Sequence, residues 1–131
     1  MLKVIVVGVG GFLGATARYG LSGLVHRKVD TYFPVGTMVV NVTGCLVIGV
    51  LMSLIEDRQL FSLNTRLFLT SGLLGGFTTF SSFGYETIEL FRAGSTRLAI
   101  LNVMGNTIIS LVAVFAGWSA TRAAVGFGGS C

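Results

Sequence analysis

Residues 72–84 carry the side chains in this sequence that are best suited to binding an ion. They read Gly-Leu-Leu-Gly-Gly-Phe-Thr-Thr-Phe-Ser-Ser-Phe-Gly. Paired glycines followed by two threonines make a poor helix, so we expect the chain to break at Gly75 and Gly76. Unwound carbonyl groups can coordinate a cation, and the N–H groups of a following half-helix can face an anion.

Two phenylalanines follow the expected break. Phe80 and Phe83 are three residues apart and therefore share one helical face, with the hydroxyls of Ser81 and Ser82 close by. An aromatic ring has a positive edge, which can favour a small anion. Phenylalanines on a membrane helix more often face lipid or the protein core, and that alternative stays open on these residues alone.

A polar stripe runs along the last apolar segment. Asn102, Asn106 and Ser110 recur every four residues, with Thr107 beside them, and an earlier apolar segment contains Asn41. Carboxamides in hydrocarbon are costly unless they are paired. The stripe fits either a polar path or hydrogen bonds between helices, and its spacing does not separate the two.

Long apolar segments must position these residues. The chain has 131 residues, of which 53% are hydrophobic and 11% charged, too few polar groups to cover a water-soluble globule. About 20 apolar residues cross the roughly 30 Å of hydrocarbon in a bilayer. The sequence therefore predicts an all-α integral membrane protein with one domain, residues 1–125, and four transmembrane helices at residues 4–25, 34–55, 66–91 and 97–122. Residues 126–131 are expected to be a flexible tail or an expression remnant.

Small residues and turn residues refine this picture. Helices in lipid associate through small side chains that allow close approach. Such residues occur in each of the first three spans: Gly10 and Gly14, Gly44 and Gly49, and Gly72 and Gly76. Pro34 suits the first turn of a helix, and we expect loops over residues 56–64 and 93–95.

The basic residues are balanced between the two membrane sides. An even number of spans places both termini on one side, with Lys3, Arg58, Arg66 and Arg122, and the opposite side has Arg27, Lys28, Arg92 and Arg97. Arg18 lies near that second boundary. The positive-inside rule then gives almost no orienting bias, which suggests an antiparallel homodimer of dual topology. The alternative is that one loop or the insertion machinery sets a single orientation.

Several functions are disfavoured by missing groups. The interiors of spans one, two and four hold no carboxylate, and Glu86 lies near the end of span three, so passive permeation fits better than proton-coupled export. A cleaved signal peptide at the start is disfavoured, because the sequence predicts no soluble domain after it. His26, expected in a loop, has no nucleophile beside it, which argues against a membrane hydrolase.

Two further motifs carry no function. The glycines at residues 8–14 resemble a dinucleotide-binding fingerprint, but three membrane spans follow instead of a soluble βαβ unit. The two cysteines, Cys45 and Cys131, have no spacing typical of zinc ligands or of a disulfide framework.

Three motifs together resemble the Fluc family of fluoride channels, also called CrcB. They are Gly-Phe-Leu-Gly-Ala-x-x-Arg-Tyr at residues 11–19, Gly-Thr-x-x-x-Asn at residues 36–41 and Gly-Gly-Phe-Thr-Thr-Phe-Ser-Ser-Phe at residues 75–83. The resemblance covers all four spans. Two rivals are a small multidrug exporter, which would need a carboxylate in span one, and an assembly subunit whose glycine faces only bind partner helices.

The resemblance implies a passive channel, not an enzyme, that exports fluoride from the cytoplasm across the inner (plasma) membrane. It implies an antiparallel homodimer with two pores and no organic cofactor or nucleic-acid partner. A structural sodium ion at the dimer centre would be held by the carbonyls of Gly75 and Thr78 from both subunits. Fluoride would meet the ring edges of Phe80 and Phe83. The remaining pore positions would be Asn41, Ser81, Ser82, Asn106, Ser110 and Glu86, with Arg18 structural or at the vestibule.

Overall fold

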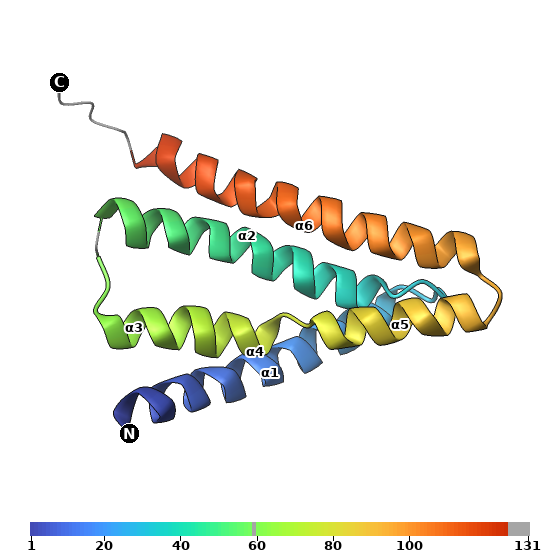
Figure 1. Cartoon of the computed structure of the whole chain (residues 1–131), viewed down its shortest axis with the longest axis horizontal. Coiled ribbons are helices and arrows are strands. Elements are labelled where there is room, and N and C mark those ends of the chain that lie inside the picture. The colour runs from blue at the N-terminus through green and yellow to red at the C-terminus, as the bar shows by residue number, and fades with distance from the viewer. Residues whose placement is uncertain (59, 126–131) are drawn as a thin grey trace.

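All the regular elements in the described part of the chain are helices. The computed structural model describes residues 1–58 and 60–125, and the expected tail at residues 126–131 lies outside them. Its elements are α1 (Leu2–Lys28), α2 (Val35–Arg58), α3 (Leu63–Leu67), the π-helix η1 (Phe68–Leu74), α4 (Gly75–Phe77), α5 (Phe80–Arg92) and α6 (Thr96–Ala124). Figure 1 shows four passes side by side, with α1 beginning and α6 ending at the same end of the molecule.

Three single helices among the described residues are long and apolar enough to cross a membrane. They comprise Leu2–Lys28, Val35–Glu56 and Thr96–Ala124. The remaining pass is made by α3, η1, α4 and α5 in succession, so no single helix in it reaches that length. This arrangement confirms an all-helical membrane protein whose third pass is broken.

The helix ends differ from the expected bounds. Helix α1 continues to Lys28, so His26 lies in its last turn and not in a loop. Basic side chains stabilise the C-terminal end of a helix, where the helix dipole is negative. Arg27 and Lys28 therefore favour a longer α1 instead of ending it. The loop expected over residues 56–64 is also shorter, because α2 continues to Arg58 and α3 begins at Leu63.

The turn expected at residues 93–95 is confirmed. Gly94 adopts a positive φ of 76°. Its N–H donates to the Phe91 carbonyl oxygen at 3.0 Å, and the Ser95 N–H donates to that of Leu90 at 2.9 Å. This pair of bonds is the Schellman arrangement that ends α5 and reverses the chain into α6.

Glycines bring the helix backbones together. A Cβ added at Gly10 would lie 2.7 Å from the Phe68 carbonyl oxygen, and one at Gly14 would fall against that of Leu73. On the other side, a Cβ at Gly49 would fall against the carbonyl of Val114 on α6. The predicted role of these glycines in close helix packing is confirmed.

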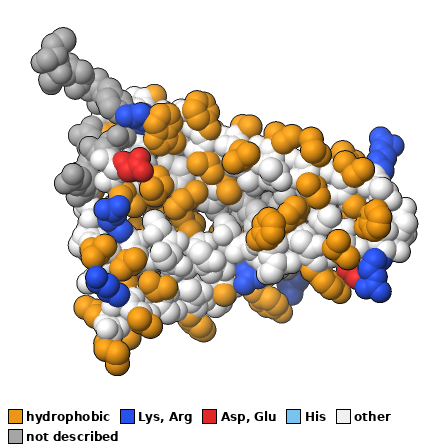
Figure 2. Space-filling model, in the orientation of Figure 1, with side chains coloured by type: hydrophobic (Ala, Val, Ile, Leu, Met, Phe, Trp, Pro, Cys, Tyr) orange, Lys and Arg blue, Asp and Glu red, His pale blue; other side chains and the backbone are white. Residues whose placement is uncertain are grey.

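The exterior is apolar over most of its length. Figure 2 shows hydrophobic side chains spread over the visible face, while most of the Lys and Arg side chains lie towards the two ends. Phe12, Leu111 and Phe115 are each more than 60% exposed in the single chain. A band of this kind suits lipid or a partner subunit and is expected of a multi-pass membrane protein.

The break in the third pass lies two residues beyond its expected position. Gly75 has helical angles, φ −61° and ψ −37°, whereas Thr78 has φ −78° and ψ 158°. The expectation of a break at the glycine pair was therefore wrong. Gly76 is needed for packing, since a Cβ there would lie 2.9 Å from the Gly11 Cα. Thr79 supports the break by capping α5, its hydroxyl accepting from the Ser82 N–H at 3.2 Å.

Candidate functional site

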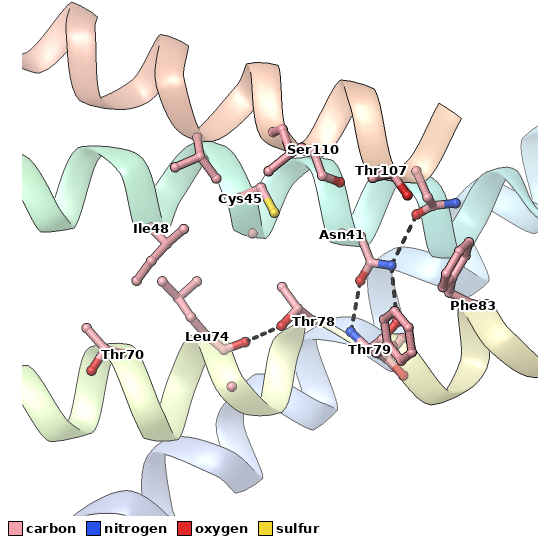
Figure 3. A pocket seen from close by; sticks show the side chains of 16 residues that line it. Asn41, Cys45, Ile48, Thr70, Leu74, Thr78, Thr79, Phe83, Thr107 and Ser110 are labelled. Atoms are coloured by element: carbon pink, nitrogen blue, oxygen red, sulfur yellow. Dashed lines mark hydrogen bonds between the residues drawn. The ribbon is translucent and has the colours of Figure 1, made fainter. Parts of the chain in front are cut away.

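Asn41 on α2 holds the break in place. Its Oδ1 accepts from the Thr79 N–H at 2.8 Å, and its Nδ2 donates to the Thr79 carbonyl oxygen at 3.1 Å. The side chain thus gives the Thr79 N–H the acceptor that it lacks and adds a donor to the Thr79 carbonyl, as the dashed lines in Figure 3 show. A polar residue on one helix therefore stabilises an unwound residue on another.

The same bonds release two carbonyl groups. In a continuous helix the N–H of Thr79 would bond to Gly75, and that of Ser82 would bond to Thr78. Both N–H groups are directed elsewhere, to Asn41 Oδ1 and to Thr79 Oγ1. Gly75 and Thr78, the two residues that the family resemblance assigns to sodium, are thus left with main-chain oxygens suited to a hard cation.

The two phenylalanines contact each other directly after the break. The ring centroids of Phe80 and Phe83 lie 5.4 Å apart with an interplanar angle of 60°, an edge-to-face arrangement. Phe83 is buried, whereas Phe80 is 82% exposed in the single chain. The expected shared face is confirmed. On it, the Phe83 ring is buried in the core and the Phe80 ring is exposed in the single chain.

A cluster of hydroxyl groups surrounds the start of α5. Thr79 Oγ1 donates to Ser82 Oγ at 3.1 Å and lies 3.2 Å from Ser81 Oγ. Ser81 is exposed and Ser82 partly buried. These hydroxyls stand at the positive end of a helix of 13 residues, where donors and dipole act in the same direction on an anion.

A groove of about 500 Å³ runs between α2, the broken pass and α6. Several expected site residues line it, namely Asn41, Gly75, Thr78, Phe80, Phe83, Asn106 and Ser110. Figure 3 places Phe83 beside Asn41 towards one end, with Ile48 and Thr70 towards the other. Ser110 Oγ is buried without a hydrogen-bond partner among the described residues. The groove therefore combines apolar walls with a few polar groups, one of them unsatisfied.

The asparagine stripe on α6 forms interhelical hydrogen bonds. Asn41 Nδ2 donates to Asn106 Oδ1 at 3.2 Å, and Asn106 Nδ2 donates to Asn102 Oδ1 at 2.9 Å. Asn102 Nδ2 then donates to Thr87 Oγ1 on α5, also at 2.9 Å. The stripe thus serves as a contact between helices, and its Asn106 also lines the groove.

Four other expected positions lie outside the groove lining: Ser81 and Ser82 at the start of α5, Glu86 and Arg18. Glu86 Oε1 accepts from the Thr37 hydroxyl at 2.6 Å, and its second oxygen, Oε2, is buried without a hydrogen-bond partner among the described residues. Arg18 Nε donates to the Gly76 carbonyl oxygen at 3.2 Å. Arg18 thereby fastens α1 to the turn just before the break, a structural contact.

Sequence reasoning did not assign roles to three threonines of the site. Thr79 is the unwound residue itself, and Thr37 and Thr87 bond to the carboxylate and to the asparagine stripe. Spacing could have indicated two of them. Thr37 precedes Asn41 by four residues and Thr87 follows Phe83 by four, so each shares a helical face with an expected site residue.

A family model described as "CrcB-like protein, Camphor Resistance (CrcB)" matches residues 5–118. The chain belongs to the CrcB family. The match extends through all four passes and ends on α6, so the CrcB assignment covers both the break and the groove described above.

Curated relatives of this CrcB chain are similar over nearly their whole length. A protein of Parabacteroides distasonis is 45% identical over 117 residues, 89% of this chain and 91% of that protein, and is named fluoride-specific ion channel FluC. One from Clostridium perfringens with the same name is 43% identical over 122 residues, 93% and 95% of the two chains. A protein of Methanosarcina acetivorans named fluoride-specific ion channel FluC 1 is 42% identical over 117 residues, 89% and 88% of the two chains.

Proposed function

We propose that this protein is a passive, fluoride-selective ion channel that exports fluoride from the cytoplasm across the inner (plasma) membrane. The observation that carries the proposal is the groove at the break, where an edge-to-face phenylalanine pair adjoins hydroxyl and amide groups. The names of the curated relatives support the choice of ion. Fluoride resistance of the cell would be the biological result.

Dehydration sets the physical problem that such a channel must solve. Moving a small ion from water into a medium of low dielectric constant costs of the order of 20 kcal/mol before the site compensates. The hydroxyls of Ser81, Ser82 and Ser110, the amide of Asn106 and the ring edges of Phe80 and Phe83 would replace part of the lost water. A narrow path lined by fixed donors disfavours larger halides.

We further propose that two chains form an antiparallel homodimer with two pores. The groove and the exposed ring of Phe80 support a partner chain, because no helix in the described part of this chain covers them. At the centre of the dimer, a sodium ion would be held by the released carbonyls of Gly75 and Thr78 from each subunit. Four main-chain oxygens suit a hard cation.

Fluoride efflux from liposomes that carry the purified protein tests the proposed activity. A fluoride-selective electrode should report rapid release from loaded vesicles, while vesicles without protein retain the ion. Chloride-loaded vesicles with the same protein density should release their ion at least about a hundredfold more slowly, a difference of roughly 2.7 kcal/mol in barrier height. Equal release of the two halides would overturn the selectivity and with it the proposal.

Sodium removal tests the central cation. Protein purified with sodium replaced by N-methylglucamine should give a lower melting temperature and a smaller dimer fraction, because four carbonyl oxygens would then face one another uncompensated. Returning sodium should restore both values, whereas choline should not. Identical melting curves under the two conditions would remove the metal from the scheme.

A further inference from the structure

Five hydrogen bonds form a relay that begins and ends on the backbone of the same pass. It runs from the Thr79 N–H through the side chains of Asn41, Asn106, Asn102 and Thr87, and ends at the Phe83 carbonyl oxygen, which accepts from the Thr87 hydroxyl at 2.7 Å. Each donor in the relay points the same way along it. The relay therefore ties α2, α6 and α5 together around the two phenylalanines.

The backbone fixes the direction of every amide in this relay. The Thr79 N–H can only donate and its carbonyl can only accept, so Asn41 must place Oδ1 and Nδ2 as observed. With Asn41 set, Asn106 must present Oδ1 to it and Nδ2 to Asn102. The carbonyl of Phe83 fixes the other end, because it can only accept from Thr87.

A count of donors then separates the three asparagines. Both N–H groups of Asn41 are used, one on Thr79 and one on Asn106. Asn102 is fully buried, at 0% exposure, and does not line the groove. Asn106 lines the groove, and only one of its two N–H groups has a hydrogen-bond partner within residues 1–58 and 60–125. Of the three amides, Asn106 alone thus combines a spare donor with a place at the groove.

We propose that Asn106 donates this second N–H to the permeating anion and that Asn102 and Thr87 are positioning residues that hold its amide in the donating orientation. The inference rests on the proposed channel function. It assigns roles to Asn102, one hydrogen bond from the groove-lining Asn106, and to Thr87, two hydrogen bonds from it. If Thr87 loses its hydroxyl, Asn102 is no longer anchored at its far end. The amide of Asn106 then loses its fixed acceptor and samples other orientations.

The dependence of flux on fluoride concentration tests the relay with matched variants. Thr87→Val removes the hydroxyl at nearly constant shape and should raise the half-saturating fluoride concentration about fivefold, the effect of one hydrogen bond of roughly 1 kcal/mol. Thr87→Ser keeps the hydroxyl and should restore the wild-type value within twofold. The control is Thr121→Val on α6. The Thr121 hydroxyl also donates to the carbonyl four residues earlier, at 2.8 Å, but accepts no hydrogen bond from an asparagine of the described residues, so the half-saturating fluoride concentration should stay at the wild-type value.

A double variant separates positioning from a loss of stability. Asn106→Ala removes the proposed donor and should raise the half-saturating fluoride concentration at least as much as Thr87→Val does. Adding Thr87→Val to Asn106→Ala should then change the half-saturating concentration by less than twofold. A further fivefold rise in the double variant, or a wild-type value in either single variant, overturns the relay. A wild-type protein without fluoride flux would instead overturn the proposed function itself, so the two failures are distinguishable.

Discussion

Single side chains in this protein take over bonds that a continuous helix would make for itself. Asn41 supplies an acceptor and a donor to Thr79, and the Thr79 hydroxyl caps α5 through Ser82. These side-chain hydrogen bonds satisfy the unwound backbone in an apolar environment, where an N–H or carbonyl group without a partner would cost free energy. They also draw the N–H groups of Thr79 and Ser82 away from the carbonyls of Gly75 and Thr78, which leaves these two oxygens available to a cation.

Phe80 offers the cleanest test of the aromatic role. Its ring is 82% exposed in the single chain, so Phe80→Ile removes the ring without leaving a cavity in that chain. We expect fluoride flux to fall at least tenfold, while the melting temperature changes little. Phe91→Ile is the matched control, since Phe91 is also exposed and lies on α5. Unchanged flux in Phe80→Ile would exclude the ring from the path.

The broken pass works as a set of short elements, each with its own packing constraint. Before the break, η1 has the wider π-helical turn, and the Gly75 N–H reaches the carbonyls of both Thr70 and Gly72. Thr70 and Gly75 both line the groove. Gly10 and Gly72 let α1 approach η1 closely, since a Cβ added at Gly72 would lie 2.9 Å from the Val7 carbonyl oxygen.

Gly14→Ala tests this close approach. A Cβ at residue 14 would fall against the backbone of Leu73 and lie 2.8 Å from the Phe77 nitrogen. Backbone atoms cannot move aside cheaply, so we expect a loss of about 2 kcal/mol in stability, seen as a lower melting temperature. Gly23→Ala on the same helix has nothing within 4 Å of the new Cβ and should be neutral or slightly stabilising. Equal melting temperatures for the two variants would contradict the packing argument.

The molecule as a whole has two similar ends. Basic residues flank the helices at both, and the start of α1 and the end of α6 lie at the same end, so the count of basic residues gives almost no orienting bias. An antiparallel pair would bring two grooves together about a two-fold axis. Dual topology, as proposed, depends on the charge distribution over the whole chain, and no single residue requires it.

Oppositely biased variants test dual topology in cells. Arg27→Ala with Lys28→Ala should place the termini inside, and Lys3→Ala with Arg66→Ala should place them outside, as C-terminal reporter fusions would show. All four side chains are exposed, so folding should be unaffected. Each biased variant alone should fail to confer fluoride resistance, whereas co-expression should restore it. Full resistance from either variant alone would establish a single orientation.

Local composition was enough to predict the four passes and the glycine contacts. Long charge-free stretches select the bilayer as solvent whatever the packing, and the Gly94 turn follows from the need for a positive φ. The Phe80 and Phe83 pair followed from helical spacing alone. Each of these features depends on neighbours within one turn of helix or on the apolar length of a segment.

Only the tertiary structure decided where the third pass opens and which residues hold it open. Gly75 and Gly76 are weak helix formers, yet both stay helical. Helix α1 packs against Gly76, and the break lies at Thr78 and Thr79, where Asn41 can reach. The relay to Thr87 likewise depends on side chains from α2, α6 and α5 meeting at bonding distance. The way helices cross decides which side chains come within bonding distance. Asn41 and Asn106 are 65 positions apart in the sequence, and the residues next to each of them do not indicate the contact.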